Sequence, residues 1–293
     1  MDIDPLDEHY SFVKIKDKDS FRKSLVSLEM PTLLEKFVNL GFLEDTIKDN
    51  IIERKYHLIS KGKQLANLFR NLAKASIISF DLETTSIHPM KAEIVGVSFS
   101  IKEFEGYYIP LLFPNNLDSA IIPDFDRAIV LENMKKIFSR NDICFCGQNI
   151  KYDILILKRN GIEVKGNLFD TMIAESLIHP NRSSYKLDIL ALDYLKYQMI
   201  PIEDLIGKKG KDQKLMSEVE LDIISYYACE DSDVAFQLYF ILCKDLSKKQ
   251  LDTIYYDIEI PTLSVLVDME YSGVYIDASF LQNLSTDVGK KLN

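Results

Sequence analysis

The sequence predicts an α/β domain built on a mixed sheet flanked by helices. Short apolar runs typical of strands cluster between residues 52 and 148, whereas helical spacing of apolar residues dominates from residue 149 onward. Strands that come first, with helices around and after them, favour a mixed sheet covered by helices. The chain has 293 residues, of which 47% are hydrophobic. This length and composition suit one or two domains with a substantial core.

The predicted strands come first along the chain. They are KYHLIS at a sheet edge, SIISFDLE, AEIVGVSFSI, GYYIPLLF and DICFCGQ. Amphipathic helices are expected at KQLANLFRNLAKA and DRAIVLENMKKIFSR, where apolar residues recur three and four positions apart. The helix NIKYDILILKRNG follows the last strand directly, and Gly161 is its expected C-cap.

The rest of the chain is predicted to be mainly helical. The expected helices are FDTMIAESLIHP, YKLDILALDYLKYQ, SEVELDIISYYACEDSDVAFQLYFILCKDLSKK and a further one from residue 251. The segment PIEDLIGKKGKDQKLM (201–216) interrupts them as a basic loop. It is either a solvated charged loop or a mobile loop that contacts phosphate. We divide the chain into an N-terminal tail with short helices at 1–51, a main domain at 52–250 and a further segment at 251–293.

Composition narrows the class of protein. The formal net charge is −10, whereas a module that binds phosphate backbones by charge alone would be basic. Contact with nucleic acid would therefore need a local site with metal ions, or a connection to a more basic domain. No apolar run approaches the roughly 18 residues of a membrane span, and the polar N-terminus is no signal peptide. The four cysteines are expected to be reduced core thiols, so we expect a cytoplasmic protein.

Two acids at the end of one predicted strand need an explanation. Asp81 and Glu83 lie two positions apart in SIISFDLETTS, so their side chains share one face of the strand. Two like charges this close repel each other and raise each other's pKa. Such a pair by itself indicates a strand end with two solvated acids. If further acids lie close to the pair, the group indicates a cation site.

Two further acids are candidates for the same site. Asn149 stands at a strand-to-helix junction, where it could be an N-cap, and Asp153 follows one turn into the helix. Tyr227 and Asp231 are four residues apart in a strongly apolar helix, so they stack on one face. A buried Asp231 would need a partner or a metal ion. Asp233 lies about 200° further around the helix, so we expect it to be solvated or paired with a lysine.

The four acids Asp81, Glu83, Asp153 and Asp231 come from one strand and two helices. Carboxylate oxygens suit hard cations such as Mg²⁺ and Mn²⁺. Four acids around one site suit two such ions, which can clamp the attacking and leaving oxygens of a phosphodiester. Because no cysteine or histidine belongs to the set, zinc is disfavoured.

Four segments carry a family resemblance. FDLETTS, GQNIKYD, LFDTM and YYACEDSDVAFQL resemble the exonuclease motifs of the DEDD superfamily of 3'-5' exonucleases. Within it, the chain is similar to the proofreading domains of bacterial, family A DNA polymerase I over residues 52–250. The resemblance implies a ribonuclease H-like fold and hydrolysis of phosphodiester bonds at DNA 3' ends, in DNA replication and repair. MPTLLEKFVNLGF resembles the last helices of a 5' nuclease domain or the linker after it. EIPTLSVLVDMEYSGVYID resembles the start of a polymerase domain, so no polymerisation is expected from the residues present.

The resemblance also assigns roles to the acids. It implies that Asp81, Glu83 and Asp231 hold the first metal ion, and that Asp81 bridges to a second, which Asp153 holds through water. One subfamily uses His-x4-Asp in the third motif and the other Tyr-x3-Asp; no histidine here has an aspartate five positions on, so Tyr227 identifies the tyrosine subfamily. Tyr227 would orient the attacking water. Its ordinary pKa near 10 makes tyrosine a poor base, so the metal ions are expected to activate that water.

Neighbouring residues are assigned to the substrate on the same resemblance. Thr84 would contact the terminal nucleotide and Ile87 would wedge against the terminal bases. The single-strand track would be lined by Gln148, Asn149 and Tyr152. Ile202 stands where relatives carry an aromatic residue that stacks on a base, and this departure would weaken single-strand binding, because stacking is worth about 1–3 kcal/mol per base. Asp170 in LFDTM is expected to be a helix N-cap instead of a metal ligand.

Three functions therefore compete. The first is a proofreading 3'-5' exonuclease that acts as a monomer on the 3' end of single-stranded DNA, with a polymerase domain in cis in the full-length protein. The second is a ribonuclease D-like exoribonuclease, which EYSGVYID disfavours because such an enzyme would continue into a helical RNA-binding domain. The third is a catalytically inactive DNA-binding scaffold, which the intact acid set and the low pI of about 5.0 disfavour.

Overall fold

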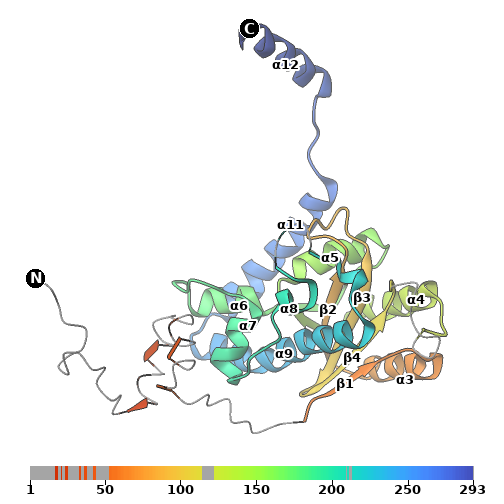
Figure 1. The fold of residues 1–293 in the computed structure, drawn as a ribbon, viewed down its shortest axis with the longest axis vertical. Helices are drawn as coiled ribbons and strands as arrows, with labels where there is room; N and C mark the ends of the chain where they lie inside the picture. The colour runs from red at the N-terminus through yellow and green to blue at the C-terminus, as the bar shows by residue number, and fades with distance from the viewer. Residues whose placement is uncertain are drawn as a thin grey trace, which may run out of the picture.

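The computed structural model describes residues 53–113, 122–208, 210 and 213–292, together with scattered residues between 17 and 43. The described residues form a six-stranded mixed sheet with helices packed against it (Figure 1). The predicted α/β class with a mixed sheet is therefore confirmed. The short helices predicted within 1–51 lie outside the described residues except at those scattered positions.

The six strands all lie between residues 55 and 170. They are β1 (Lys55–Leu58), β2 (Ile77–Thr84), β3 (Ile94–Lys102), β4 (Glu105–Pro110), β5 (Cys144–Gly147) and β6 (Asn167–Asp170). Their order across the sheet is β1-β4-β3-β2-β5-β6. The neighbouring strands β2, β3 and β4 are antiparallel, whereas β1 pairs with β4, β5 with β2 and β6 with β5 in parallel.

Helices connect and cover the strands. The longer ones are α3 (Gly62–Leu72), α4 (Arg127–Phe138), α5 (Ile150–Arg159), α6 (Thr171–Ile178), α9 (Leu221–Lys248), α11 (Ile260–Ser272) and α12 (Ala278–Leu292). The shorter ones are α7 (Leu187–Leu190), η2 (Ala191–Leu195), α8 (Ile202–Ile206), η3 (Met216–Glu218), α10 (Asp252–Ile254) and η4 (Tyr255–Glu259). In the part of the chain that the structure describes, no helix is long and apolar enough to cross a membrane.

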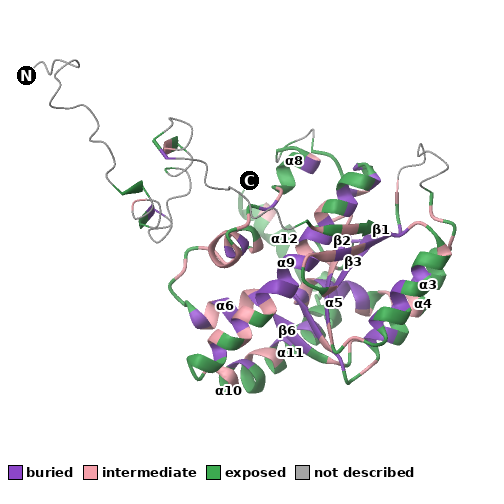
Figure 2. Cartoon of the chain, turned by 90° about the horizontal axis from the view of Figure 1, so that it is seen from below, coloured by how far each residue is buried: buried purple, intermediate pink, exposed green. Residues whose placement is uncertain are grey.

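The sheet has two differently covered faces. On one face, alternate residues of β2 such as Ile78 and Phe80 join the main core, in which the Phe80 and Phe138 rings lie 4.9 Å apart. Helices α3, α4, α5 and α11 pack on this face and contribute to the same core. The long helix α9 crosses the other face and contacts β1, β2, β3 and β4. Buried residues accordingly gather along the sheet and on the sides of α5 and α9 (Figure 2).

Most predicted elements are confirmed, including Gly161, which follows the C-cap of α5 with a φ of +72°. One strand was missed. The prediction placed Phe169 and Asp170 in a helix, but residues 167–170 form β6 and pair with β5. Four residues with two apolar ones carry too little alternation to be distinguished from the first turn of the helix that follows.

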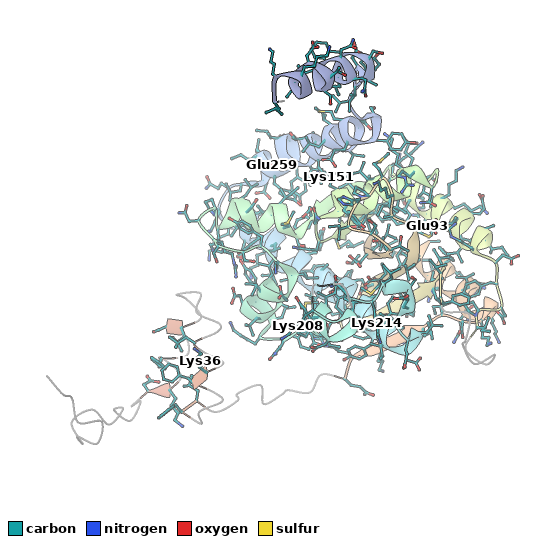
Figure 3. All side chains as sticks on the ribbon, turned by 45° about the horizontal axis from the view of Figure 1, so that its top comes forward. Lys36, Glu93, Lys151, Lys208, Lys214 and Glu259 are labelled. Atoms are coloured by element: carbon teal, nitrogen blue, oxygen red, sulfur yellow. The ribbon has the colours of Figure 1, made fainter. Side chains whose placement is uncertain are left out.

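One other segment differs from the prediction. Within the predicted loop 201–216 the structure has α8, and Lys208 and Lys214 lie exposed on the segment after it (Figure 3). Residues 252–272 pack on the same unit as residues 53–250, because Tyr255, Leu263 and Val267 are buried in its cores. Helix α12 carries no buried residue and lies apart from the sheet (Figure 1).

Candidate active site

The open end of β2 presents the first two acids. Pairing with β5 covers residues 77–79, whereas pairing with β3 continues to Thr84, so the end of β2 runs past β5. Leu82 points into the main core. Asp81 and Glu83 therefore share the other face, the one that α9 covers. The predicted common face of the two acids is confirmed.

Asp153 reaches the same strand from the other side of the sheet. It lies one turn into α5, which starts directly after β5. Its side chain is 3% exposed, and its Oδ1 accepts a hydrogen bond of 3.2 Å from the backbone N–H of Leu82. This bond holds Asp153 at the peptide between Asp81 and Leu82. The position of Asp153 in its helix would by itself suggest a surface residue, but the structure buries it.

Helix α9 completes the group. Carboxylate oxygens of Asp81, Glu83 and Asp231 all lie within 4.8 Å of one another. Tyr227 stands one turn before Asp231 on the same helix face and interacts with its carboxylate. The structure thus brings three of the predicted metal ligands into one cluster. Asp153 is placed beside that cluster through Leu82.

Burial and mutual repulsion raise the pKa of every acid in the group. Burial raises the pKa of Asp81 to about 6. The pKa of Glu83 is raised well above its ordinary value by burial and then by the charge of Asp81. Burial followed by the charge of Asp81 also raises the pKa of Asp153 and Asp231 well above the usual range. The four groups together cannot all be ionised without added positive charge.

The residues present fit a divalent cation. Among the described residues, no lysine or arginine forms an ion pair with any of the four acids. Glu83 Oε1 is buried and accepts no hydrogen bond there. An unsatisfied buried carboxylate oxygen is costly unless a cation neutralises it. An all-oxygen donor set of this kind suits Mg²⁺ or Mn²⁺.

A groove of about 520 Å³ opens beside the acids. Its lining residues are Asp81, Leu82, Gln148, Asn149, Tyr152, Asp153, Met172 and the segment 183–187. Three of the residues predicted to contact substrate, Gln148, Asn149 and Tyr152, therefore line it. The prediction missed the wall formed by 183–187, because a short polar stretch between two helices gives no sequence signal of its neighbours.

Thr84, Ile87 and Ile202, the other residues predicted to contact substrate, are not among the residues that line the groove. Thr84 Oγ1 and the Tyr152 hydroxyl share a hydrogen bond of 2.6 Å, which joins the end of β2 to α5. Ile87 is 86% exposed, as a residue that wedges against a ligand would be. Ile202 begins α8 with 40% of its surface exposed, and it is not among the residues that line the groove.

The side chain of Asn149 does not cap α5 as predicted, and Asp170 caps two helices instead of one. Asn149 occupies the N-cap position of α5 but makes no side-chain capping bond, since its φ of 55° lies in the left-handed region instead of the extended region usual for caps. The Asp170 carboxylate takes over: it accepts from the N–H groups of Asn149 and Ile150, and also caps α6 as predicted through Met172 and Ile173. Asp170 thus ties the helix that carries Asp153 to α6.

The expectation for Asp233 is also wrong. Asp233 is completely buried, and Arg54 Nη1 donates to its Oδ2 over 2.5 Å. The hydroxyl of Tyr56, the N–H of Phe104 and Gln237 Nε2 supply three further donors at 2.7–2.9 Å. Its partner is an arginine 179 residues away along the chain, which local helix geometry cannot indicate.

Comparison with known families gives one extensive match. Residues 56–247 match the family model of the 3'-5' exonuclease domain of family A DNA polymerases. DNA polymerase I of Borreliella burgdorferi is 32% identical over 272 residues, which are 93% of this chain and 29% of that protein. DNA polymerase I of Pseudomonas aeruginosa is 34% identical over 226 residues, which are 76% of this chain and 24% of that protein. The chain thus spans less than a third of the length of these curated relatives.

Solved structures share the fold at low identity. The POL domain of Pol1 from M. smegmatis, in complex with DNA primer-template and dNTP, superposes with a TM-score of 0.59 and 16% identity over 80% of this chain and 35% of that one. Brucella melitensis NrnC with bound Mg²⁺ superposes with a TM-score of 0.54 and 16% identity over 78% of this chain and 99% of that one. These likenesses support the ribonuclease H-like fold.

Proposed function

The chain belongs to the 3'-5' exonuclease family found in DNA polymerase I, and from this premise we propose that it removes nucleotides from DNA 3' ends with two divalent cations. The observation that carries the proposal is the cluster of Asp81, Glu83 and Asp231, whose oxygens lie within 4.8 Å of one another. No basic side chain in the described part of the chain forms an ion pair with them. Such a cluster is unfavourable unless cations bind in it.

Exonuclease domains of this kind use divalent metal ions, and we assign the ligands from the geometry and the family motifs. Asp81, Glu83 and Asp231 would hold one ion, and Asp81 with Asp153 would hold the second. When bound, the ions supply a nucleophile at neutral pH and neutralise charge on the phosphodiester oxygens. Mg²⁺ and Mn²⁺ are the candidates because every proposed ligand is a carboxylate.

Tyr227 would position the attacking water without taking its proton. Burial first and then the charge of Asp231 raise the pKa of Tyr227 far above its ordinary value, so its hydroxyl stays protonated at neutral pH. A fixed hydroxyl next to Asp231 can hold a water in line with the scissile bond, which is where orientation contributes to rate.

The groove beside the acids would hold the 3'-terminal nucleotides. Gln148 is held by a 2.7 Å hydrogen bond to the Tyr185 carbonyl, so it braces the wall formed by 183–187. Tyr152 is held against Thr84, which would contact the terminal nucleotide, and exposed Asn149 would face the strand. Ile87 would meet the terminal bases and Ile202 an unstacked base further along. Within a whole polymerase, this activity would remove misincorporated nucleotides.

A single assay tests the proposal against its rivals. The chain is incubated with 5'-labelled single-stranded DNA or RNA in Mg²⁺ or Mn²⁺, with EDTA as the matched blank. Stepwise shortening of DNA that EDTA abolishes is the expected result. A clear preference for RNA would favour a ribonuclease D-like enzyme. Absence of metal-dependent cleavage, with Asp231→Ala indistinguishable from the unaltered chain, would favour an inactive scaffold.

A further inference from the structure

Unpaired polar atoms collect next to the acid cluster. Among the described residues, four buried side-chain oxygens have no hydrogen-bond partner: Ser79 Oγ, Glu83 Oε1, Ser98 Oγ and the Tyr108 hydroxyl. Buried polar atoms are normally paired, so each exception calls for an explanation. An ionised Glu83 carboxylate accepts hydrogen bonds and cannot donate them, whereas the Tyr108 hydroxyl can donate one. The two groups are therefore chemically complementary.

The sheet register brings these two residues together. Glu83 on β2 pairs with Gly96 on β3, and Gly96 pairs with Pro110 on β4. Tyr108 lies two residues before Pro110, on the same face of the sheet. Glu83 and Tyr108 therefore face α9 from strands on either side of β3.

Gly96 makes room for the tyrosine to cross β3. A Cβ placed on Gly96 would lie 2.1 Å from the Tyr108 hydroxyl oxygen, so the hydroxyl occupies the space that a side chain at this position would fill. Side chains directly opposite in an antiparallel pair have Cβ atoms about 5 Å apart. The hydroxyl therefore lies at the position of the cross-strand neighbour of Glu83 and senses the charge of its carboxylate, although the structure shows no hydrogen bond between the two.

Resting on the proposed function, we infer that Tyr108 is a positioning residue for Glu83, and that its hydroxyl donates a hydrogen bond to Glu83 Oε1 when a cation occupies the site. The other carboxylate oxygen is then left for the cation. Hydrogen bonds from outer residues that orient a metal ligand commonly contribute ten- to hundredfold to metal affinity. The burial of Tyr108, together with the charge of Glu83, raises its pKa well above the ordinary value, so the proton needed for donation stays in place.

The test uses Tyr108→Phe, which keeps the ring and removes only the hydroxyl. We expect the dissociation constant for Mn²⁺, measured by calorimetry or electron paramagnetic resonance, to rise about tenfold. In EDTA the variant should unfold at the same denaturant concentration or a higher one, because a buried hydroxyl without a partner has been removed. Turnover on single-stranded DNA should fall while KM is unchanged. Tyr107→Phe is the matched control, since Tyr107 donates to Glu105, and it should keep wild-type Mn²⁺ affinity.

A double-mutant cycle with Glu83→Gln locates the effect. If Tyr108 acts through the Glu83 carboxylate, Tyr108→Phe should change Mn²⁺ affinity much less in the Glu83→Gln background than in the unaltered chain. Wild-type Mn²⁺ affinity in Tyr108→Phe would overturn the inference, as would an equal loss in both backgrounds. If the unaltered chain itself binds no Mn²⁺, the proposed function fails, and that outcome is distinct because it precedes any comparison of variants.

Discussion

Asp231 and Asp233 lie two residues apart on α9 and have opposite surroundings. Asp233 is completely buried, pairs with Arg54 and accepts from three further donors. Asp231 has Asp81 and Glu83 within 4.8 Å and no basic side chain among the described residues. Burial raises the pKa of both acids, but the donors around Asp233 favour its ionised form, whereas the acids around Asp231 disfavour its ionised form. On this contrast, Asp233 holds neighbouring segments together, whereas Asp231 is a carboxylate that we propose binds a cation.

The same contrast extends to other buried acids. Glu230 accepts hydrogen bonds from the Tyr197 hydroxyl at 2.5 Å and the Ile200 N–H at 2.8 Å. Asp170 accepts from four backbone N–H groups at two helix starts. These side chains hold the loops and helices around the acid cluster in place. The four acids that the family motifs assign to metal binding differ in one respect: among the described residues, no lysine or arginine forms an ion pair with any of them, although Asp153 accepts from the Leu82 N–H and Asp231 interacts with Tyr227.

The largest expected effect comes from Asp231→Asn. We expect turnover on single-stranded DNA to fall on the order of a thousandfold, because one proposed metal ligand is lost. Without metal, the unfolding free energy should rise by about 1 kcal/mol, because repulsion from Asp81 and Glu83 is removed. Activity assays and urea unfolding in EDTA measure the two changes. Asp222→Asn, an exposed acid on the same helix, is the control and should leave both quantities near their original values. Strong destabilisation by Asp231→Asn would contradict the contrast.

Arg54→Met tests the other side of the comparison. It leaves Asp233 buried without its cation, which should lower the unfolding free energy by about 3–5 kcal/mol. Lost stacking on the Tyr197 ring, 3.6 Å from the guanidinium carbon, adds to this cost. Activity per folded molecule should be preserved, because Arg54 does not touch the acid cluster.

Lys102→Met is the matched control for Arg54→Met, since it breaks an exposed ion pair with Glu105 of 3.4 Å. Its cost should stay below about 1 kcal/mol. Adding Asp233→Leu to Arg54→Met should restore much of the lost stability, because the unpaired charge is removed. Equal losses in Arg54→Met and Lys102→Met would show that Asp233 needs no cation.

The acid cluster should also give the metal-free chain an unusual dependence on pH. Burial raises the pKa of Asp81 from 3.8 to about 6, so the folded chain holds a proton that the unfolded chain has already released. Stability that is present below about pH 4 is then lost as the pH rises through 6, and the other acids of the cluster continue the loss. We expect the unfolding free energy in EDTA to fall by about 2 kcal/mol between pH 5 and pH 8.

Saturating Mg²⁺ should remove or reverse this fall, because cations replace the protons. Denaturant unfolding at several pH values, with and without Mg²⁺, measures the difference. Asp81→Asn should make the metal-free curve less steep, while the other raised acids keep part of the slope. A metal-free unfolding free energy that is constant or rising from pH 5 to pH 8 would contradict the raised pKa values on which the comparison depends.

The sequence predicted the parts of the site that depend on local periodicity. The alternation of β2 placed Asp81 and Glu83 on one face, and helical spacing placed Tyr227 beside Asp231. It missed what depends on contacts between distant segments: Arg54 as the partner of Asp233, the Asp170 cap on α5, and the reach of Tyr108 across Gly96. Strand β6 was missed because four residues carry too little pattern. Sequence periodicity specifies which way a side chain points, but not what it meets.

The smallest expected effect lies outside the acid cluster, at Ile202. This exposed residue stands where the family resemblance implies an aromatic stacking platform, and it is 40% exposed at the start of α8. Ile202→Phe should lower KM for single-stranded DNA about fivefold, which corresponds to roughly 1 kcal/mol of stacking, with turnover unchanged. Ile129 on α4 is 49% exposed, so Ile129→Phe is the matched control and should leave KM unchanged. Equal decreases in KM for both variants would show that any added aromatic surface binds DNA, and that α8 does not contact the strand. A selective decrease at Ile202 would indicate that the single strand crosses α8.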